Sequence, residues 1–421
     1  MDRRMPWRAQ CRPRASGTAH IRREKVGLWC RHRSLERPQE ATRMPNGIND
    51  FLRHKHPGPA HAAPRKRHPW RIALGALGTV LLVTVAAGGV YAFSLTRAFD
   101  SGTENISNAF PEEASRPPAG QAAPGTAGVA AANAPAGPLD PSAVLGGVPA
   151  GQAQTILLLG SDTRGATGKD LAGIRGERSD TMMVVHVPAD RKSLSVMSIM
   201  RDSWVEVPGH GQAKINAALS WGGVPLAVQT VENLLGTRID HVAVVDFSGF
   251  EQATDALGGV DIDNPIAFDS YHFKGHHFDA GSQHLNGKEA VAFARERYAF
   301  QDGDFQRVRN QQLIISGLLT AAMHRSVFAD PVKLSGLLKT LTPFLAVDDG
   351  LDSAYLTSLG WELRDVREPQ VTFFTMPTDG TGTSSDGQSI VHVDWVGLAA
   401  VKKGLQTDTM RDYQPELQAM G

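Results

Sequence analysis

The chain has 421 residues, enough for one large domain or two ordinary ones with accessory segments, and its formal net charge is zero. The charge is unevenly distributed, because residues 1–100 hold 19 Lys/Arg against 6 Asp/Glu and the remaining residues hold 24 against 37. Arginines in the later part therefore stand on an acidic background, which excludes a uniformly basic surface as their explanation. The two cysteines, Cys11 and Cys30, both lie near the start, so no disulfide is available to the rest of the chain.

Residues 1–71 form a basic, Arg-rich segment without apolar periodicity, and we expect it to be disordered. It ends in a cluster of four cations, Arg65, Lys66, Arg67 and Arg71. A topology signal and attraction to anionic lipid explain this charge more simply than a nucleic-acid-binding arm, so no nucleic acid is expected as a partner. The sequence leaves open whether Met1 or Met44 is the true start.

Residues 72–93 are 22 positions without a charge, the length of a transmembrane helix. The basic flank before them places the N-terminus in the cytoplasm and the rest of the chain outside, as a single-pass protein of the cell membrane. A cleaved signal peptide is the alternative, but the apolar run is long and lies far from the N-terminus. Residues 94–150, rich in Ala, Gly and Pro, predict an extracytoplasmic tether.

The folded part is predicted to begin near residue 151, with a core over 151–325 and a completing region over 326–421. Apolar runs predict strands at 154–160, 182–188, 193–200, 241–246 and 371–376, and a turn into a short strand at 258–262. Helical spacing predicts helices at 225–235, 247–257, 286–295, 305–323, 331–341, 353–364 and 395–403, the last capped by Asp394. This mixture predicts an α/β fold with a mixed central sheet flanked by helices.

Two carboxylates, Asp162 and Asp180, stand at predicted strand ends, where open α/β sheets bind ligands. A pair of this kind can hold Mg²⁺ or Mn²⁺ and leave coordination positions for phosphate oxygens. Each of them could instead cap a helix or stabilise a turn.

The same stretch and the helices after it are rich in arginine, the residue suited to bidentate contact with phosphate. Arg295 and Arg297 are two positions apart, so they would diverge on a helix but point the same way on an extended segment that leaves one. Arg307 and Gln311 lie one turn apart at a helix start that favours an anion. The candidates for an anion site are Arg178, Arg201, Arg295, Arg297, Arg307 and Gln311, with Arg164 and Arg309 as further possibilities. The alternative is a set of surface salt bridges.

Other motifs are weaker. His272, His276, His277 and His284 fall in one loop, but no cysteine or helically spaced pair supports a zinc site. The glycine-rich loop after residue 165 lacks the P-loop frame, and no Gly-x-Ser-x-Gly elbow is present.

An ordered series of motifs over residues 150–325 resembles the LytR-CpsA-Psr family, and the Ala, Gly and Arg usage is similar to that of actinobacterial members. The motifs are Ile156 to Arg164, Arg178 to Met182, Val187 to Lys192, Ser198 to Asp202, Val207 to Gly211 with Lys214 to Asn216, Val244 to Phe250, Asp255 to Val260, Arg295-x-Arg297, and Asp302 to Arg307 with Gln311-Gln312.

This resemblance implies transfer of a wall glycopolymer from a polyprenyl-pyrophosphate carrier to peptidoglycan through a phosphodiester bond. Carried over by position, Asp162 and Asp180 would hold Mg²⁺. Arg201, with Arg178, Arg295, Arg297, Arg307 and Gln311, would bind the pyrophosphate, and apolar residues between sheet and helices would house the lipid. Either aspartate could accept the proton of the attacking sugar hydroxyl.

The chain departs from the family pattern at Met200, Tyr298 and Asn310, where proline, histidine and arginine are common. Asn310 removes a charge that we expect near the head group. The alternatives to a transferase are a pyrophosphatase with water as acceptor, a non-catalytic wall-binding protein and a regulator of gene expression. For a shared anionic ligand, we expect the arginines to be close together and unpaired.

Overall fold

The computed structural model describes residue 93 and residues 96–118, 151–161, 179–324, 331–363, 366 and 370–412, all within one compact unit, Pro69–Gly421. The predicted basic segment 1–71 and all of the predicted span 72–93 except Phe93 lie outside these residues. Within the described ranges, no helix combines the length and the hydropathy needed to cross a membrane.

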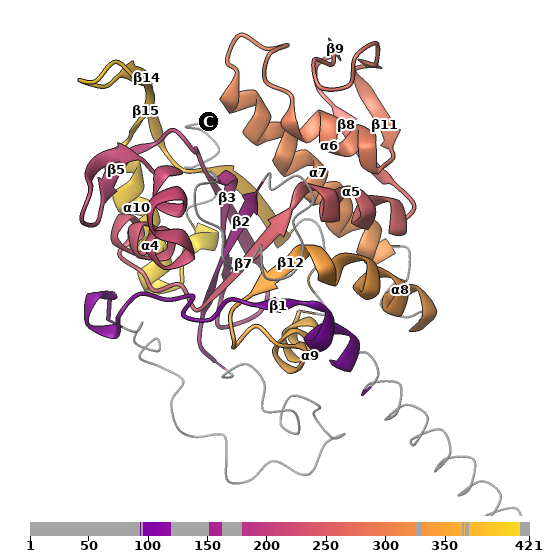
Figure 1. The fold of residues 1–421 in the computed structure, drawn as a ribbon, viewed down its shortest axis with the longest axis horizontal. Helices are drawn as coiled ribbons and strands as arrows, with labels where there is room; N and C mark the ends of the chain where they lie inside the picture. The colour runs from indigo at the N-terminus through magenta and orange to yellow at the C-terminus, as the bar shows by residue number, and fades with distance from the viewer. Residues whose placement is uncertain are drawn as a thin grey trace, which may run out of the picture. The chain divides into compact units, whose positions relative to one another are not determined.

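A seven-stranded mixed sheet forms the centre of the molecule (Figure 1). Its strands, from one edge to the other, are β1 (Glu104–Asn105), β12 (Leu345–Val347), β7 (His241–Asp246), β2 (Gln154–Ser161), β3 (Ser179–Val187), β4 (Leu194–Ile199) and β13 (Val371–Thr375). Strand β2 runs parallel to β7 and antiparallel to β3, and β4 runs antiparallel to β3 and parallel to β13. The sheet is therefore mixed, as predicted.

Successive side chains of a strand point to opposite faces of the sheet, so the hydrophobic core has a part on each face. Leu157 and Leu159 of β2 pack in one hydrophobic cluster with α4 (Ala217–Leu235) and α10 (Trp395–Thr407). Ile156, on the opposite face, packs with Tyr355 and Leu359 of α9 (Ser353–Glu362). The helices α5 (Phe247–Ala256), α7 (Asp304–His324) and α8 (Pro331–Leu341) stand on the side of the sheet away from α4 and α10 (Figure 1).

A second hydrophobic cluster joins α6 (Gly287–Arg295) and α7 to four short strands. Phe268, Phe278 and Phe293 are at its centre, with ring centroids 4.9 to 5.5 Å apart. Helix α6 begins with a full capping box between Asn286 and Glu289. The strands are β8 (Val260–Asn264), β9 (Phe268–Asp269), β10 (His277–Phe278) and β11 (Gly281–Leu285).

The tether was predicted to cover residues 94–150, but part of this range belongs to the folded unit. Within the range 94–150, β1 pairs with β12, and Phe99 and Ile106 are 5% and 2% exposed. Arg116 forms an ion pair of 2.7 Å with Glu232, a fully buried residue of α4. Residues 96–118 are therefore part of the folded unit, because their few apolar side chains find partners far away in the sequence.

Most predicted elements appear within two residues of their expected bounds, and Asp394 caps α10 as predicted, accepting from the backbone nitrogens of Val396 and Gly397. Helix α4 begins eight residues before the predicted start at Pro225, with a break at Gly223, where φ is 68°. The short strands β1, β9, β10, β11 and β12 were not predicted. Neither were the hairpins of β5 (Trp204–Val207) with β6 (Gly211–Lys214) and of β14 (Thr378–Thr383) with β15 (Ser389–Val393).

Candidate functional site

The strand directions bring the candidate residues to one edge of the sheet. Ser161, the last residue of β2, lies opposite Ser179, the first residue of β3, because the two strands are antiparallel. Strand β4 ends at Ile199 on the same edge, so that Asp180 and Arg201 come together although 21 positions separate them. The topology therefore supports the prediction that ligands bind at these strand ends.

Arg201 is held between two carboxylates. Its Nη1 donates to Asp180 Oδ1 at 2.6 Å, and its Nε donates to Asp304 Oδ2 at 2.8 Å. Asp304 is the first residue of α7, so this contact fixes the start of the helix against the sheet edge. Burial works to lower the pKa of Arg201, but Asp304 and Asp180 outweigh it and raise the pKa. The guanidinium is thus fully charged and fixed in orientation.

Asp304 is a shared partner for three arginines. Arg307 Nη2 lies 3.1 Å from Asp304 Oδ2, and Arg297 Nη1 lies 3.5 Å from Asp304 Oδ1. Burial works to raise the pKa of Asp304, but Arg307 and Arg201 hold it below its usual value. Asp202 lies 3.8 Å from Arg201 and 3.2 Å from Lys214. With Asp180 and this pair included, four cations face three carboxylates, so one positive charge is in excess. We call Arg201, Arg297, Arg307, Asp180 and Asp304 the arginine cluster.

Two buried nitrogen donors, one within this cluster and one on the next turn of α7, have no hydrogen-bond partner among the described residues. Arg307 Nε and Gln311 Nε2 make no hydrogen bond within the described part of the chain, although their residues are only 5% and 4% exposed. They lie four positions apart, hence on one face of α7. A buried donor without an acceptor costs about 1–3 kcal/mol, so the arrangement favours an acceptor supplied by a ligand. Anionic oxygens, such as those of a phosphate, are suited to this position.

The expectation that the arginines are unpaired is wrong for Arg201, Arg297 and Arg307, which share Asp304. Sequence reasoning missed Asp304 as a site residue, although its spacing of three from Arg307 at a helix start was a usable signal. The guanidinium of Arg295 lies 5.1 Å from the ring centroid of Phe247, the first residue of α5. Asp162, Arg164 and Arg178 lie outside the described residues.

Asn310 stands where the family pattern commonly has arginine, and we expected this replacement to remove a charge near the substrate head group. In the structure, the Asn310 side chain has a structural role instead. Asn310 is fully buried, and its Nδ2 donates to the carbonyl oxygen of Phe293 at 3.1 Å. Its Oδ1 accepts from Gln306 Nε2 at 2.9 Å. The side chain therefore ties α7 to the end of α6 and supports the segment that carries Arg297. Met200 is also buried, against Val308 and Val391.

The residues present are compatible with a divalent cation. Asp180 engages Arg201 through Oδ1, and its side chain remains 27% exposed. Mg²⁺ commonly takes one or two carboxylates and completes its shell with water and phosphate oxygens. Within the described ranges, no group of three or more metal-ligating side chains is present.

The histidine loop does not form a zinc cluster within the described residues. His277 Nδ1 lies 2.7 Å from Asp269, and His284 Nδ1 lies 2.6 Å from Asp261, each pair on the surface. His276 stacks on Phe273 with ring centroids 4.9 Å apart. These contacts stabilise the two short hairpins and leave the arginine cluster as the better candidate site.

An apolar groove lies along the same helix. It has a volume of 520 Å³ and is lined by one face of α7, by Phe373 of β13 and by Ile266. On α7 its wall is formed by Gln306, Arg309, Gln312, Leu313 and Ser316. By helical periodicity these residues lie on a different face of α7 from Arg307 and Gln311. Leu313, Phe373 and Ile266 supply its apolar surface, which suits a hydrocarbon chain.

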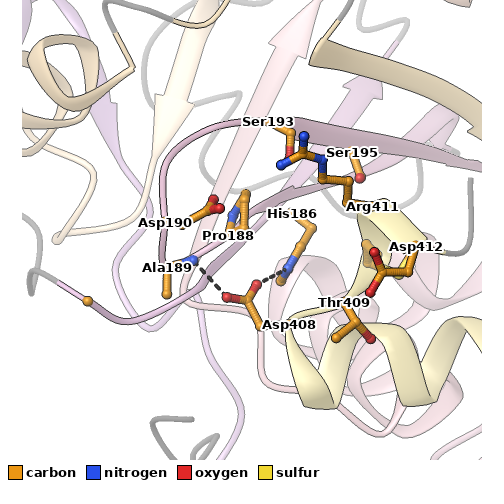
Figure 2. Close-up of a pocket in the computed structure, with 12 residues that line it drawn as sticks. His186, Pro188, Ala189, Asp190, Ser193, Ser195, Asp408, Thr409, Arg411 and Asp412 are labelled. Atoms are coloured by element: carbon orange, nitrogen blue, oxygen red, sulfur yellow. Dashed lines mark hydrogen bonds and ion pairs between the residues drawn. The ribbon is translucent and has the colours of Figure 1, made fainter. Parts of the chain in front are cut away.

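A second pocket, of 450 Å³, lies at the opposite end of β3. Figure 2 shows Asp408 between His186 and the backbone of Ala189; its oxygens are 2.9 Å from His186 Nε2 and 2.9 Å from Ala189 N. Six residues separate Asp180 from His186 along the strand, which places the pocket ~20 Å from the arginine cluster. This contact joins β3 to the end of α10, and the pocket is separate from the anion site.

The fold and the cluster together define a class of protein: an α/β domain with an arginine-rich candidate site at the strand ends. The model of the LytR_cpsA_psr family matches residues 129–407. Because this is well over half of the chain, the protein belongs to the LytR-CpsA-Psr family.

Named relatives connect this family with the cell wall. The chain is 30% identical over 280 residues to the cell wall biosynthesis protein LcpA of Corynebacterium glutamicum, covering 58% of this chain and 53% of that protein. It is 37% identical over 200 residues to the polyisoprenyl-teichoic acid–peptidoglycan teichoic acid transferase TagU of Bacillus anthracis, covering 47% of this chain and 62% of that protein. The chain thus spans little more than half the length of these relatives.

A solved structure has the same fold. The crystal structure of B. subtilis TagV superposes with a TM-score of 0.52 and 28% sequence identity, covering 62% of this chain and 98% of that one. The predicted fold class is confirmed by this likeness and by the sheet described above.

Proposed function

We propose that this chain is a membrane-anchored phosphotransferase that moves a glycopolymer from a polyprenyl-pyrophosphate carrier to peptidoglycan. The main support is the pair of buried, unpartnered donors, Arg307 Nε and Gln311 Nε2, next to an arginine cluster with one excess positive charge. A pyrophosphate supplies the acceptor oxygens and the negative charge that this arrangement lacks. The transferase name of the relative TagU agrees with this chemistry.

The groove along α7 supports a lipid-linked donor. Its apolar wall, with Leu313, Phe373 and Ile266, would take the polyprenyl chain, while the start of the same helix holds the pyrophosphate. Burial of hydrocarbon contributes about 25 cal/mol for each Å² removed from water, so the lipid adds affinity that is independent of the charges.

The reaction follows from charge placement. A sugar hydroxyl of peptidoglycan attacks the phosphorus that carries the glycopolymer, the bond from this phosphorus to the bridging oxygen breaks, and polyprenyl phosphate leaves. The proton of the hydroxyl passes to a carboxylate of the site, Asp180 or Asp162. Arg201, Arg297 and Arg307 stabilise the charge on the leaving phosphate, and phosphoryl transfer depends mostly on such positioning and neutralisation.

Mg²⁺ or Mn²⁺ would be held by Asp180, with Asp162 as the second ligand that the family resemblance implies. When bound, it would neutralise further charge on the pyrophosphate. The domain would lie outside the cell, anchored by residues 72–93, with residues 1–71 in the cytoplasm. An export-dependent reporter fused after Gly421 should be active; activity of a cytoplasmic reporter at this position would contradict the topology.

The reaction is tested by incubating the purified full chain with a lipid-linked glycan and peptidoglycan fragments. We expect a glycan–peptidoglycan phosphodiester and release of polyprenyl phosphate, both lost in Arg307→Ala and retained in Lys403→Ala, which changes an exposed cation of α10. Release of lipid phosphate without glycan transfer would instead establish a pyrophosphatase. Binding of peptidoglycan with no turnover of the carrier would identify a wall-binding protein.

A further inference from the structure

Two exposed tyrosines stand side by side next to the arginine cluster. Tyr271 and Tyr298 are 61% and 58% exposed, yet their ring centroids are only 4.6 Å apart, with an angle of 51° between the planes. Tyr271 follows β9, and Tyr298 follows α6, so the pair is assembled from two separate segments. Both elements belong to the module built around α6 and α7 (Figure 1).

A buried carboxylate holds both segments in place. Glu296 is fully buried, and its Oε1 accepts from the backbone nitrogens of Arg297, Tyr298 and Ala299 at 3.0 to 3.4 Å. Its Oε2 accepts from the backbone nitrogen of Tyr271 at 2.7 Å and from the hydroxyl of Ser270 at 3.2 Å. Because both backbones bond to one carboxylate, the two segments that carry the tyrosines are held in a fixed relative position before any ligand arrives.

Arg297 connects this tyrosine pair to the arginine cluster. Its Nη2 donates to the hydroxyl of Tyr298 at 2.6 Å, and its guanidinium carbon lies 4.5 Å from the centroid of the Tyr298 ring. Its Nη1 lies 3.5 Å from Asp304, the shared partner of Arg201 and Arg307. A ligand whose phosphate contacts Arg297 would therefore place the group attached to this phosphate near the tyrosines.

We propose that Tyr271 and Tyr298 form a saccharide-binding subsite in which a pyranose ring packs its C–H face on the tyrosine pair. This inference rests on the proposed function and adds to it a place for the sugar. An aromatic pair with polar tips suits an amphipathic ligand, because pyranose rings have apolar C–H faces and a polar rim. The lipid chain has its own groove along α7, so the exposed rings serve a different part of the substrate.

The saccharide can belong to the donor, as the sugar next to the pyrophosphate, or to the acceptor glycan of peptidoglycan. Two titrations of the full chain distinguish these sources. The first compares a prenyl pyrophosphate that carries a sugar with the same prenyl pyrophosphate without one. The second uses a soluble peptidoglycan disaccharide.

We expect Tyr271→Ala and Tyr298→Ala each to weaken binding of one sugar-bearing ligand by roughly 2- to 10-fold, the scale of one aromatic contact. Binding of the sugar-free prenyl pyrophosphate should not change. Tyr271→Phe and Tyr298→Phe keep the rings and should retain most of the affinity. Because both rings are exposed, the melting temperature of the Ala variants should stay near that of the parent chain.

Trp221→Ala is the matched control, since Trp221, on α4, is 47% exposed and its ring centroid lies 4.7 Å from that of His210. Equal affinity of the Ala variants and the parent chain for both sugar-bearing ligands would overturn the inference. So would an equal loss for the sugar-free ligand. If the sugar-free prenyl pyrophosphate does not bind the parent chain at all, the proposed function itself fails, which is a separate outcome.

Discussion

At the scale of single residues, the site depends on Asp304 as much as on the arginines. Arg201, Arg297 and Arg307 come from different elements, and each would be repelled by the others without a shared counter-ion. Asp304 allows the three to lie close together in the absence of a ligand. A ligand with several negative oxygens can then bind to three arginines that are already in place.

Asp304→Asn should lower the free energy of unfolding at pH 7 by about 1–3 kcal/mol, since it leaves charged donors without their partner. The pKa of Asp304 is lowered in the folded protein, so its stabilisation is present above the unfolded pKa of about 3.9 and is lost as the pH falls through the folded value. Melting temperatures from pH 2 to 7 should show a weaker acid dependence in the variant. Asp302→Asn, at a residue whose side chain is 43% exposed, is the control; identical pH profiles of Asp304→Asn and the parent chain would contradict the role.

Arg201→Ala and Arg297→Ala should differ in stability but not in ligand binding. Arg201 makes two ion pairs of 2.6 and 2.8 Å and is 16% exposed, whereas Arg297 is 34% exposed and 3.5 Å from its partner. Only Arg201→Ala should lower the melting temperature. Each variant should weaken binding of a short-chain prenyl pyrophosphate by about 1.5–3 kcal/mol, measured by calorimetry. Unchanged affinity in both would show that these arginines serve the fold alone.

At the scale of elements, α7 carries most of the site and is positioned by close packing. A Cβ at Gly317 would lie 2.6 Å from Val260 Cγ2 and 2.7 Å from the carbonyl oxygen of Asp261. Helix α7 therefore approaches β8 at a distance that only glycine permits. This contact and the Asn310 bond to α6 set the direction in which Arg307 and Gln311 point.

Gly317→Ala should destabilise the protein by about 1–3 kcal/mol, because α7 must move away from β8. Gly336→Ala on α8 meets no atom within 4 Å and should be neutral or stabilise by up to ~1 kcal/mol. Urea unfolding of both variants checks this prediction. Equal stability of the two variants would mean that α7 can move away from β8 at little cost in free energy.

The segment before the domain is attached to α4 by a buried ion pair. Arg116→Ala leaves Glu232 buried and without this partner and should cost about 3–5 kcal/mol of unfolding free energy. Arg238→Ala removes a pair with Glu113, whose side chain is 74% exposed, and should have a much smaller effect. Denaturant midpoints of the two variants measure the difference. An equal loss of stability in both would show that the Arg116–Glu232 pair stabilises the protein no more than an exposed pair does.

At the scale of the whole molecule, residues 96–118 belong to the folded unit and not to a free tether. They contribute β1, the buried side chains of Phe99 and Ile106, and Arg116. The backbone nitrogen of Ile106 also donates to the carbonyl oxygen of Val347, which extends the edge of the sheet.

A chain that begins at residue 151 should therefore be less stable than one that begins at residue 96, by about 5 kcal/mol or more. Thermal unfolding of the two soluble versions measures the difference. If both melt at the same temperature, the segment packs on the domain without stabilising it.

The sequence by itself determined the elements and most of the site's membership. Short, continuous apolar runs in β2, β3 and β4 predict buried strands, and charges beside them mark the strand ends. Asp180 and Arg201 were identified in this way, and Arg307 by its spacing from Gln311 at a helix start. Local patterns also fixed the cap at Asp394, since a cap depends only on neighbouring backbone groups.

Only the tertiary structure decided which charges meet. The pairing of Arg201 with Asp304 joins residues 103 positions apart, and no local pattern encodes such a distance. The same holds for β1 on β12 and for Glu232 under Arg116, whose segments have little periodicity of their own. Glu296 is the clearest case: in the sequence it is one charge between two arginines, but in the fold it is buried and positions two tyrosines, because packing of α6 against α7 removes it from water.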